Sequence, residues 1–130
     1  MADFDNALRV IIVEDDRLSA QEIDRYLTAI GYDVVDVLKT TDKALVSATQ
    51  HKPDFIIMGV QLAGPRDGIE AAQEIFSKLG IRCLFASGQV DAAIRTRAEF
   101  TKPLGWLRKP YSTENLLLVL STARRRLMHS

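Results

Sequence analysis

The chain has 130 residues, a formal net charge of zero and 47% hydrophobic residues, which fits one domain with a core of its own. The balanced charge gives no argument for nucleic acid or a membrane surface as a partner. The single cysteine, Cys83, excludes an internal disulfide, and no apolar run is long enough for a signal peptide or a membrane span, so we expect a cytoplasmic protein.

Five apolar runs predict strands, and five amphipathic segments predict helices after them. The strands are expected over residues 8–13, 34–38, 55–58, 81–86 and 105–108. The helices are expected over about 17–30, 42–51, 68–79, 91–99 and 113–127. Strands that are apolar on both faces and alternate with helices predict an α/β fold, with a parallel sheet covered on both sides.

Capping residues mark several helix ends. Thr41 and Ser112 stand where N-caps are preferred, and Gly31 and Gly80 stand where a left-handed residue ends a helix. The fourth helix has few large apolar residues, so we expect it to be docked least firmly. The side chains expected to face the sheet are Leu18, Ile23, Leu27 and Ile30 in the first helix, Ile69, Ala72, Ile75, Phe76 and Leu79 in the third, and Leu116, Val119, Leu120, Ala123 and Leu127 in the last.

Polar residues follow the predicted strands, where ligands of open parallel sheets bind. Three consecutive acids at positions 14–16 follow the first strand, Ser87 follows the fourth and Lys109 follows the fifth. Adjacent carboxylates repel each other unless a cation lies between them, and a cluster of oxygen ligands suits Mg²⁺. The alternative for the acids is a solvated turn that caps the next helix.

Together these residues closely resemble the receiver domain of bacterial two-component response regulators. The resemblance is carried by the motifs VEDD at 13–16, PDFIIM at 53–58, DG at 67–68, FASG at 85–88 and WLRKP at 106–110. It implies a CheY-like, flavodoxin-like doubly wound (βα)5 fold whose five parallel strands have the order 2-1-3-4-5. We therefore expect a single receiver domain over residues 1–130, with a core over about 8–127.

The resemblance also implies a metal site and a phosphoryl site. Asp15 directly, Glu14 through water and the backbone carbonyl of Gln61 would hold Mg²⁺. The Ser87 hydroxyl and the Lys109 ammonium would contact the phosphoryl group, a task that suits a point charge.

Two further positions match the family: one is the aromatic switch residue, and the other is the proline that follows the lysine. Pro110 matches a proline commonly preceded by a cis peptide bond, which would fix where Lys109 points. Trp106 occupies the aromatic switch position, whose rotamer would report the state of Ser87.

The sequence departs from the family at the phosphoacceptor, because Gly59 stands where the aspartate should close the third strand. Glycine has no nucleophile, so an acyl phosphate cannot form there, and Mg²⁺ binding should be weak or absent. Asp54 is no substitute, since it lies about 17 Å away along the strand. Gly59 could be natural or engineered.

We therefore expect no enzyme, but a receiver domain in a phosphorelay whose phosphoacceptor site is lost or mutated. Its partners would be a sensor histidine kinase or phosphotransfer protein and a downstream protein target, with no nucleic acid and no membrane. We expect output by partner binding on the face of the fourth helix, fifth strand and last helix, a face that could also form a homodimer. Leu117 and Leu118 lie off the inward stripe and could contribute there. The alternative is a wide core-facing stripe that would place them inside.

Two alternatives remain open. One is a phosphorylation-independent pseudo-receiver that acts as an interaction module. The other is an enzyme or nucleotide-binding domain on the same type of sheet, such as a flavodoxin-like protein. The absence of a glycine-rich phosphate loop after the first strand counts against it.

Without an acceptor, the switch is expected to rest in its inactive form. We expect the Lys109 ammonium to lie near Glu14 and Asp15 or in water. We expect Ser87 to lie away from Gly59, Trp106 to point outward or to alternate, and the fourth helix to be the most mobile element.

Overall fold

The computed structural model describes residues 7–129, and its elements follow the predicted alternation. The strands are β1 (Arg9–Val13), β2 (Asp33–Leu38), β3 (Phe55–Gly59), β4 (Arg82–Ser87) and β5 (Gly105–Arg108). The helices are α1 (Arg17–Ala29), α2 (Ala44–His51), α3 (Gly68–Leu79), α4 (Ala92–Ala98) and α5 (Thr113–Met128), and a 3-10 turn (Glu99–Thr101) follows α4. Among the described residues, no helix is both long and apolar enough to cross a membrane.

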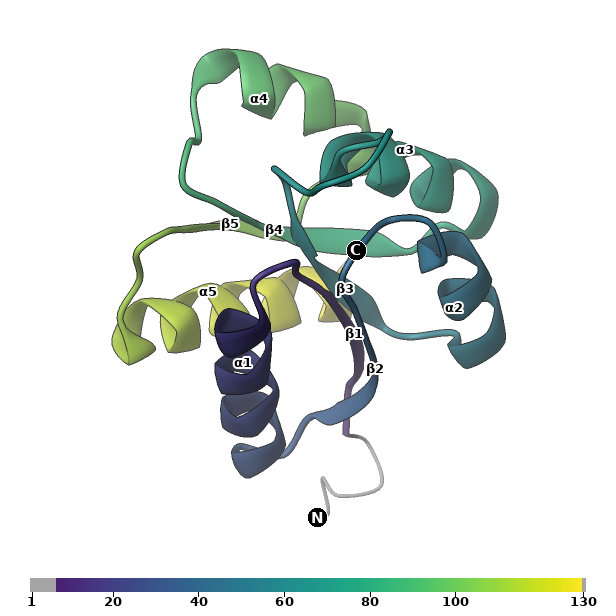
Figure 1. Ribbon diagram of the computed structural model, residues 1–130. Coiled ribbons are helices and arrows are strands. Elements are labelled where there is room, and N and C mark those ends of the chain that lie inside the picture. The colour runs from purple at the N-terminus through teal and green to yellow at the C-terminus, as the bar shows by residue number, and fades with distance from the viewer. Residues whose placement is uncertain (1–6, 130) are drawn as a thin grey trace.

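The five strands form one parallel sheet with the order β2-β1-β3-β4-β5, which confirms the predicted α/β, flavodoxin-like fold. Helices α1 and α5 cover one face of the sheet, and α2, α3 and α4 cover the other (Figure 1). In the register, Val13 pairs with Met58 and Gly59 pairs with Ala86. The carboxyl ends of β1, β3 and β4 therefore lie side by side at one edge.

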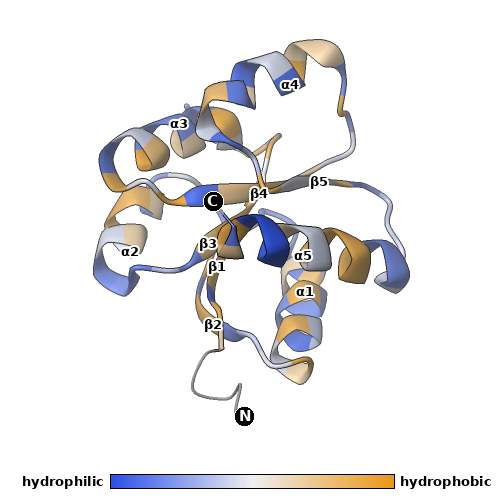
Figure 2. Cartoon of the chain, turned by 180° about the vertical axis from the view of Figure 1, so that it is seen from behind, coloured by the Kyte–Doolittle hydropathy of each residue, from blue (hydrophilic) through white to orange (hydrophobic). Residues whose placement is uncertain are grey.

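Each face of the sheet has its own apolar cluster, and the hydrophobic colour follows the strands and parts of the helices in Figure 2. Ile23 and Leu27 of α1 share one cluster with Leu120 of α5. Cys83 lies in the other cluster, where burial raises the pKa of its thiol to about 12. This free thiol is buried on β4, in keeping with the strand predicted there.

Three of the side chains predicted to face the sheet are exposed instead, so this part of the prediction is wrong. Leu18 is 68% exposed, because it lies about 140° around the helix from Ile23, and Ala20 is buried in its place. Ile30 is 42% exposed and Leu79 is 38% exposed, because they stand at or just past the ends of their helices.

The helix caps follow the predictions except at α2. Ser112 caps α5 in a capping box with Asn115, and Gly31 and Gly80 have φ angles of +106° and +71°. Thr41 is not the N-cap of α2, which begins at Ala44. The buried Thr41 hydroxyl donates instead to the Arg66 carbonyl at 3.2 Å, so it fastens the loop after β3.

Candidate functional site

The parallel sheet brings four predicted residues to its carboxyl edge. Glu14 follows β1, Gly59 ends β3, Ser87 ends β4 and Lys109 follows β5. Glu14 and Ser87 are buried polar residues, with exposures of 2% and 1%. Buried polar groups must find partners inside the protein, so their contacts describe the state of the site.

Lys109 neutralises Glu14. Its Nζ lies 2.5 Å from Glu14 Oε1, and the backbone N–H of Asp16 donates to Oε2 at 2.9 Å. Both carboxylate oxygens of a buried acid are thus already partnered. Lys109 was predicted to rest near Glu14 and Asp15 or in water, and the structure confirms the contact with Glu14. Removing Lys109 would leave a buried charge uncompensated. The Lys109–Pro110 peptide bond is cis, as the resemblance implied.

The remaining oxygen ligands form a sparse set for Mg²⁺. Asp15 is exposed, and its carboxylate makes no hydrogen bond or ion pair with any residue of the described range 7–129. Within that range, no three His, Cys, Asp or Glu side chains are grouped to hold a metal. Mg²⁺ demands octahedral oxygen coordination, and Asp15 with the Gln61 backbone carbonyl meets that demand poorly. Asp16 instead caps α1, accepting from the Ser19 N–H at 3.0 Å.

An apolar side chain fills the space beside Gly59. An ideal Cβ at Gly59 would lie 2.9 Å from Leu62 Cδ2 and 3.2 Å from the Val13 carbonyl oxygen. Leu62, on the loop after β3, packs against the apolar cluster that contains Val13 and Met58. The sequence analysis missed Leu62, because an isolated leucine in a loop carries no periodic signal.

The loop after β3 is also held by a close approach of two glycines. A Cβ at Gly68 would lie only 1.7 Å from the Gly59 carbonyl oxygen, and the Gly68 N–H donates to the Val60 carbonyl at 2.9 Å. Only glycine fits at position 68, which explains the Asp-Gly motif at the start of α3 in physical terms.

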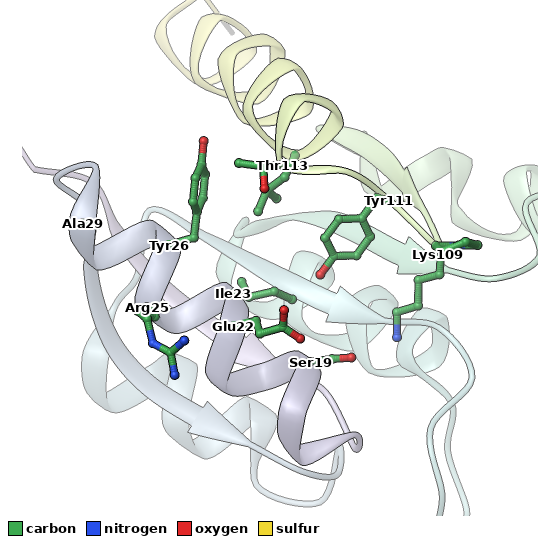
Figure 3. A pocket seen from close by; sticks show the side chains of 11 residues that line it. Ser19, Glu22, Ile23, Arg25, Tyr26, Ala29, Lys109, Tyr111 and Thr113 are labelled. Carbon is green, nitrogen blue, oxygen red and sulfur yellow. The ribbon is translucent and has the colours of Figure 1, made fainter.

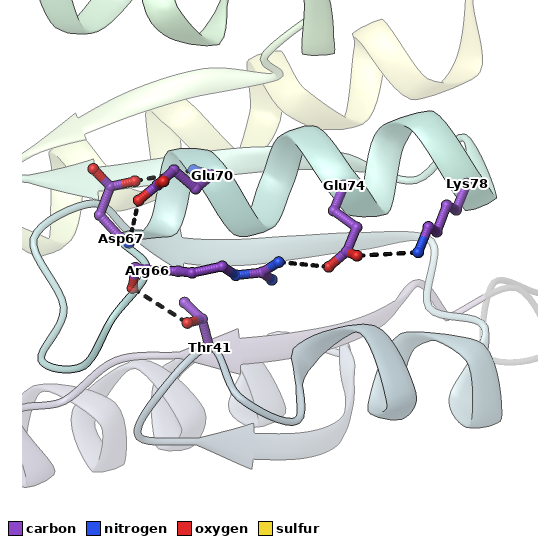
Figure 4. A network of polar contacts seen from close by, with 6 residues as sticks. All are labelled: Thr41, Arg66, Asp67, Glu70, Glu74 and Lys78. Atoms are coloured by element: carbon purple, nitrogen blue, oxygen red, sulfur yellow. Dashed lines mark hydrogen bonds and ion pairs between the residues drawn. The ribbon is translucent and has the colours of Figure 1, made fainter.

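Side chains fasten the rest of this loop to α3 (Figure 4). Arg66 donates to Glu74 at 2.7 Å and Lys78 donates to its other oxygen at 3.0 Å, and these bonds, led by that of Arg66, hold the pKa of Glu74 below its usual value. Asp67 and Glu70 form a capping box at the start of α3. The loop that carries Leu62 therefore has a defined position.

Ser87 has partners within the protein. Its Oγ lies 2.8 Å from Gln61 Oε1 and 2.7 Å from the Gln89 carbonyl oxygen, and it accepts from the Gln89 N–H at 3.0 Å. Gln61 was predicted to act through its backbone carbonyl, so the contact of its side chain is a second feature that the sequence analysis missed.

Trp106, which we expected to point outward or to alternate, is half-buried and packed against β4. Its ring stacks on Phe85, with centroids 4.9 Å apart and planes 25° apart. The register of β4 and β5 pairs these two residues, and cross-strand aromatic pairs stabilise a sheet. Arg95 of α4 lies over the ring, 5.4 Å from its centroid, in cation–π geometry.

A groove of about 760 Å³ lies beside this edge, between α1 and the start of α5 (Figure 3). Lys109 stands at its margin, and the groove is lined by apolar and polar side chains that include Ile23, Tyr26 and Tyr111. Burial, followed by the charges of Glu14 and Glu22, raises the pKa of Tyr111.

At the opposite edge of the sheet, the Asp54 carboxylate accepts from the Arg9 N–H at 2.7 Å. Asp54 therefore takes no part in the candidate site.

Comparisons with known proteins agree with this architecture. The family described as "Response regulator receiver domain" matches residues 10–121. The transcriptional regulatory protein PdtaR of Mycobacterium tuberculosis is 36% identical over 117 residues, which is 88% of this chain and 56% of that protein. The phyllosphere-induced regulator PhyR of Methylorubrum extorquens is 25% identical over 134 residues, which is 97% of this chain and 49% of PhyR. The chain thus spans about half the length of these relatives.

Solved structures agree as well. The signal receiver domain of a modulated diguanylate cyclase from Desulfovibrio desulfuricans G20 superposes with a TM-score of 0.83 at 29% identity, covering 94% of this chain and 97% of that one.

Proposed function

This chain belongs to the response regulator receiver domain family, and on that premise we propose that it signals by binding other proteins, with its phosphoacceptor position occupied by Gly59. Receiver domains are not enzymes, and they interact with kinases or phosphotransfer proteins and with downstream targets. For this chain, which we propose to be cytoplasmic, the proposed partners are a sensor histidine kinase or phosphotransfer protein and a downstream protein target.

The observation that carries the proposal is the side chain of Leu62 beside Gly59. The glycine removes the carboxylate of the family's aspartate. In addition, the Leu62 side chain occupies the adjoining space, and its Cδ2 lies 2.9 Å from where a Cβ at position 59 would stand. Lys109 is already paired with Glu14, so its ammonium has a partner inside the protein. The charged groups of Lys109 and Glu14 are thus partnered by each other, and the phosphoacceptor position lacks a nucleophile.

We also propose that Mg²⁺ binds weakly or not at all. Asp15 is the one carboxylate of the predicted ligand set that is not paired inside the described part of the chain, and Glu14 would have to leave Lys109 to assist it. Titration of Mg²⁺ while following the fluorescence of Trp106 tests this. A saturating change below millimolar Mg²⁺ would contradict it.

Intact-mass spectrometry after incubation with acetyl phosphate and Mg²⁺ tests the proposed loss of the acceptor. The unaltered protein should gain no phosphoryl group. Gly59→Asp should gain one slowly, because the new side chain must displace Leu62 and fit against the Val13 carbonyl. The double variant Gly59→Asp with Leu62→Ala should gain it faster, and Leu62→Ala alone should gain none.

Two results would overturn the proposal. Phosphorylation of the unaltered protein near Gly59 would show another acceptor, and failure of the double variant, despite its native fold, would show that Ser87, Lys109 and Asp15 do not form a phosphoryl site.

The phosphorylation-independent pseudo-receiver is the second candidate function, and the packed state of Ser87 and Trp106 favours it. Leu117 and Leu118 of α5 are 50% and 65% exposed, so they are not core residues and are available to a partner or a second copy on the α4–β5–α5 face. Sedimentation of the protein and of Leu118→Ser would show whether this face forms a homodimer. An unchanged monomer in both cases would contradict self-association.

A further inference from the structure

We propose that the hydrogen bond between the side-chain amide of Gln61 and the Ser87 hydroxyl has a positioning role. This bond holds the segment after β4 and the first turn of α4 in one position without phosphorylation. The inference deepens the proposed function, and it rests on that function because it takes Ser87 to be the switch residue. It gives the side chain of Gln61, rather than its backbone, a positioning role.

The contact between Gln61 and Ser87 suits an amide. The Ser87 hydroxyl has one proton and two acceptors within reach, Gln61 Oε1 at 2.8 Å and the Gln89 carbonyl at 2.7 Å. An amide can accept through its oxygen or, turned over, donate through its nitrogen. Gln61 can therefore pair with Ser87 whichever acceptor takes the hydroxyl proton.

From Ser87, a series of hydrogen bonds continues to α4. The Gln89 backbone N–H donates to Ser87 Oγ at 3.0 Å, and Gln89 Nε2 donates to Asp91 Oδ2 at 2.9 Å. Asp91 Oδ1 accepts from the Ile94 N–H at 3.0 Å and so caps α4. We call Gln61, Ser87, Gln89 and Asp91 the switch network.

Helix α4 depends on such polar links because it has little apolar contact. Within its seven residues, all of which are described, Ala98 alone is buried. Arg97 pairs with Asp67 at 2.9 Å, and Gln73 Nε2 donates to the Arg97 carbonyl at 2.9 Å. Gln61 and Asp67 both belong to the fastened loop after β3, so this loop positions α4 from two sides.

Trp106 can report the position of α4. Its ring stacks on Phe85 of β4 and lies beneath Arg95 of α4. Phe85 stands two residues before Ser87 on β4, and Arg95 stands four residues after Asp91 on α4, so the ring contacts residues that flank the switch network on both elements. Trp106 is the sole tryptophan of the chain, so its fluorescence is specific.

The test replaces Gln61 by methionine, which keeps the length of the side chain and removes the amide. In hydrogen exchange followed by mass spectrometry, residues 88–98 should exchange about twofold to tenfold faster, the effect of losing one neutral hydrogen bond. Trp106 fluorescence should change as well. The matched control is Gln50→Met, since Gln50 is exposed on α2 and its side chain makes no hydrogen bond with residues 7–129.

A double-mutant comparison separates this role from a general effect on stability. Ser87→Ala should also loosen residues 88–98, and adding Gln61→Met to Ser87→Ala should have no further effect, because Gln61 acts through Ser87. Additive effects, or unchanged exchange in Gln61→Met, would overturn the inference. The proposed loss of the phosphoacceptor is tested separately, by intact-mass spectrometry of the unaltered protein after incubation with acetyl phosphate. The proposed function and the role of Gln61 can therefore fail independently of each other.

Discussion

Helices α4 and α5 pack on opposite faces of the sheet beside β5 (Figure 1), and they are held by different forces. Helix α5 has sixteen residues, a capping box and three buried side chains, Leu116, Leu120 and Ala123. Helix α4 has seven residues, of which Ala98 is buried and Ile94 is half-buried, and its polar links include the switch network and the Arg97–Asp67 pair.

The difference explains which helix can respond to the site. Apolar contacts are non-directional and do not depend on the protonation or hydrogen bonding of residues at the sheet edge. Hydrogen bonds and ion pairs depend on the geometry of each partner. A change at Ser87 or at the loop after β3 should therefore reach α4 and leave α5 in place.

The largest expected effect comes from shortening one sheet-facing side chain in each of the two helices. Leu120→Ala should destabilise the protein by about 2–5 kcal/mol, because it leaves a cavity in a close-packed core. Ile94→Ala in α4, where the side chain is half-buried, should cost about 1 kcal/mol. Urea denaturation measures both, and equal losses would show that α4 is docked as firmly as α5.

A smaller effect is expected from Arg97→Met. The pair with Asp67 is partly exposed, with side-chain exposures of 43% and 29%, so its loss should cost about 0.5 kcal/mol and act locally. Hydrogen exchange should accelerate in α4 and not in α5. High salt should accelerate exchange in α4 of the unaltered protein but not of Arg97→Met, and equal salt dependence in both would exclude this pair as a tether.

The smallest effect is a dependence of α4 on pH. The Ile94 N–H, followed by Gln89, holds the pKa of Asp91 below its ordinary value of 3.8. A group whose folded pKa is lowered contributes stability above its unfolded pKa and loses it as the pH falls through the folded pKa. Protection of α4 should thus decrease below about pH 4.

The matched control for this dependence is Asp91→Asn, since asparagine caps a helix without titrating in this range. At low pH, α4 of this variant should lose less protection than α4 of the unaltered protein. Helix α5, capped by Ser112 and Asn115, carries no titrating cap and should not show the change. A parallel loss in both helices would point to general acid unfolding instead.

The sequence predicted α5 better than it predicted the surroundings of α4. Periodic apolar residues and Ser112 define α5, and continuous apolar runs place the strand ends, so the meeting of Glu14, Ser87 and Lys109 at one edge was predictable. The contacts of Leu62 and of the Gln61 side chain were not, because they depend on the path of an irregular loop. The stacking of Trp106 on Phe85 was not predicted either, since it depends on the register of two strands.

The central claim is that α4 is positioned without phosphorylation. Hydrogen exchange of residues 88–98 in the unaltered protein, measured with and without acetyl phosphate and Mg²⁺, tests it most directly. We predict the same protection in both samples and no gain of a phosphoryl group in mass. Protection that appears only with the phosphodonor, together with that mass gain, would contradict the account.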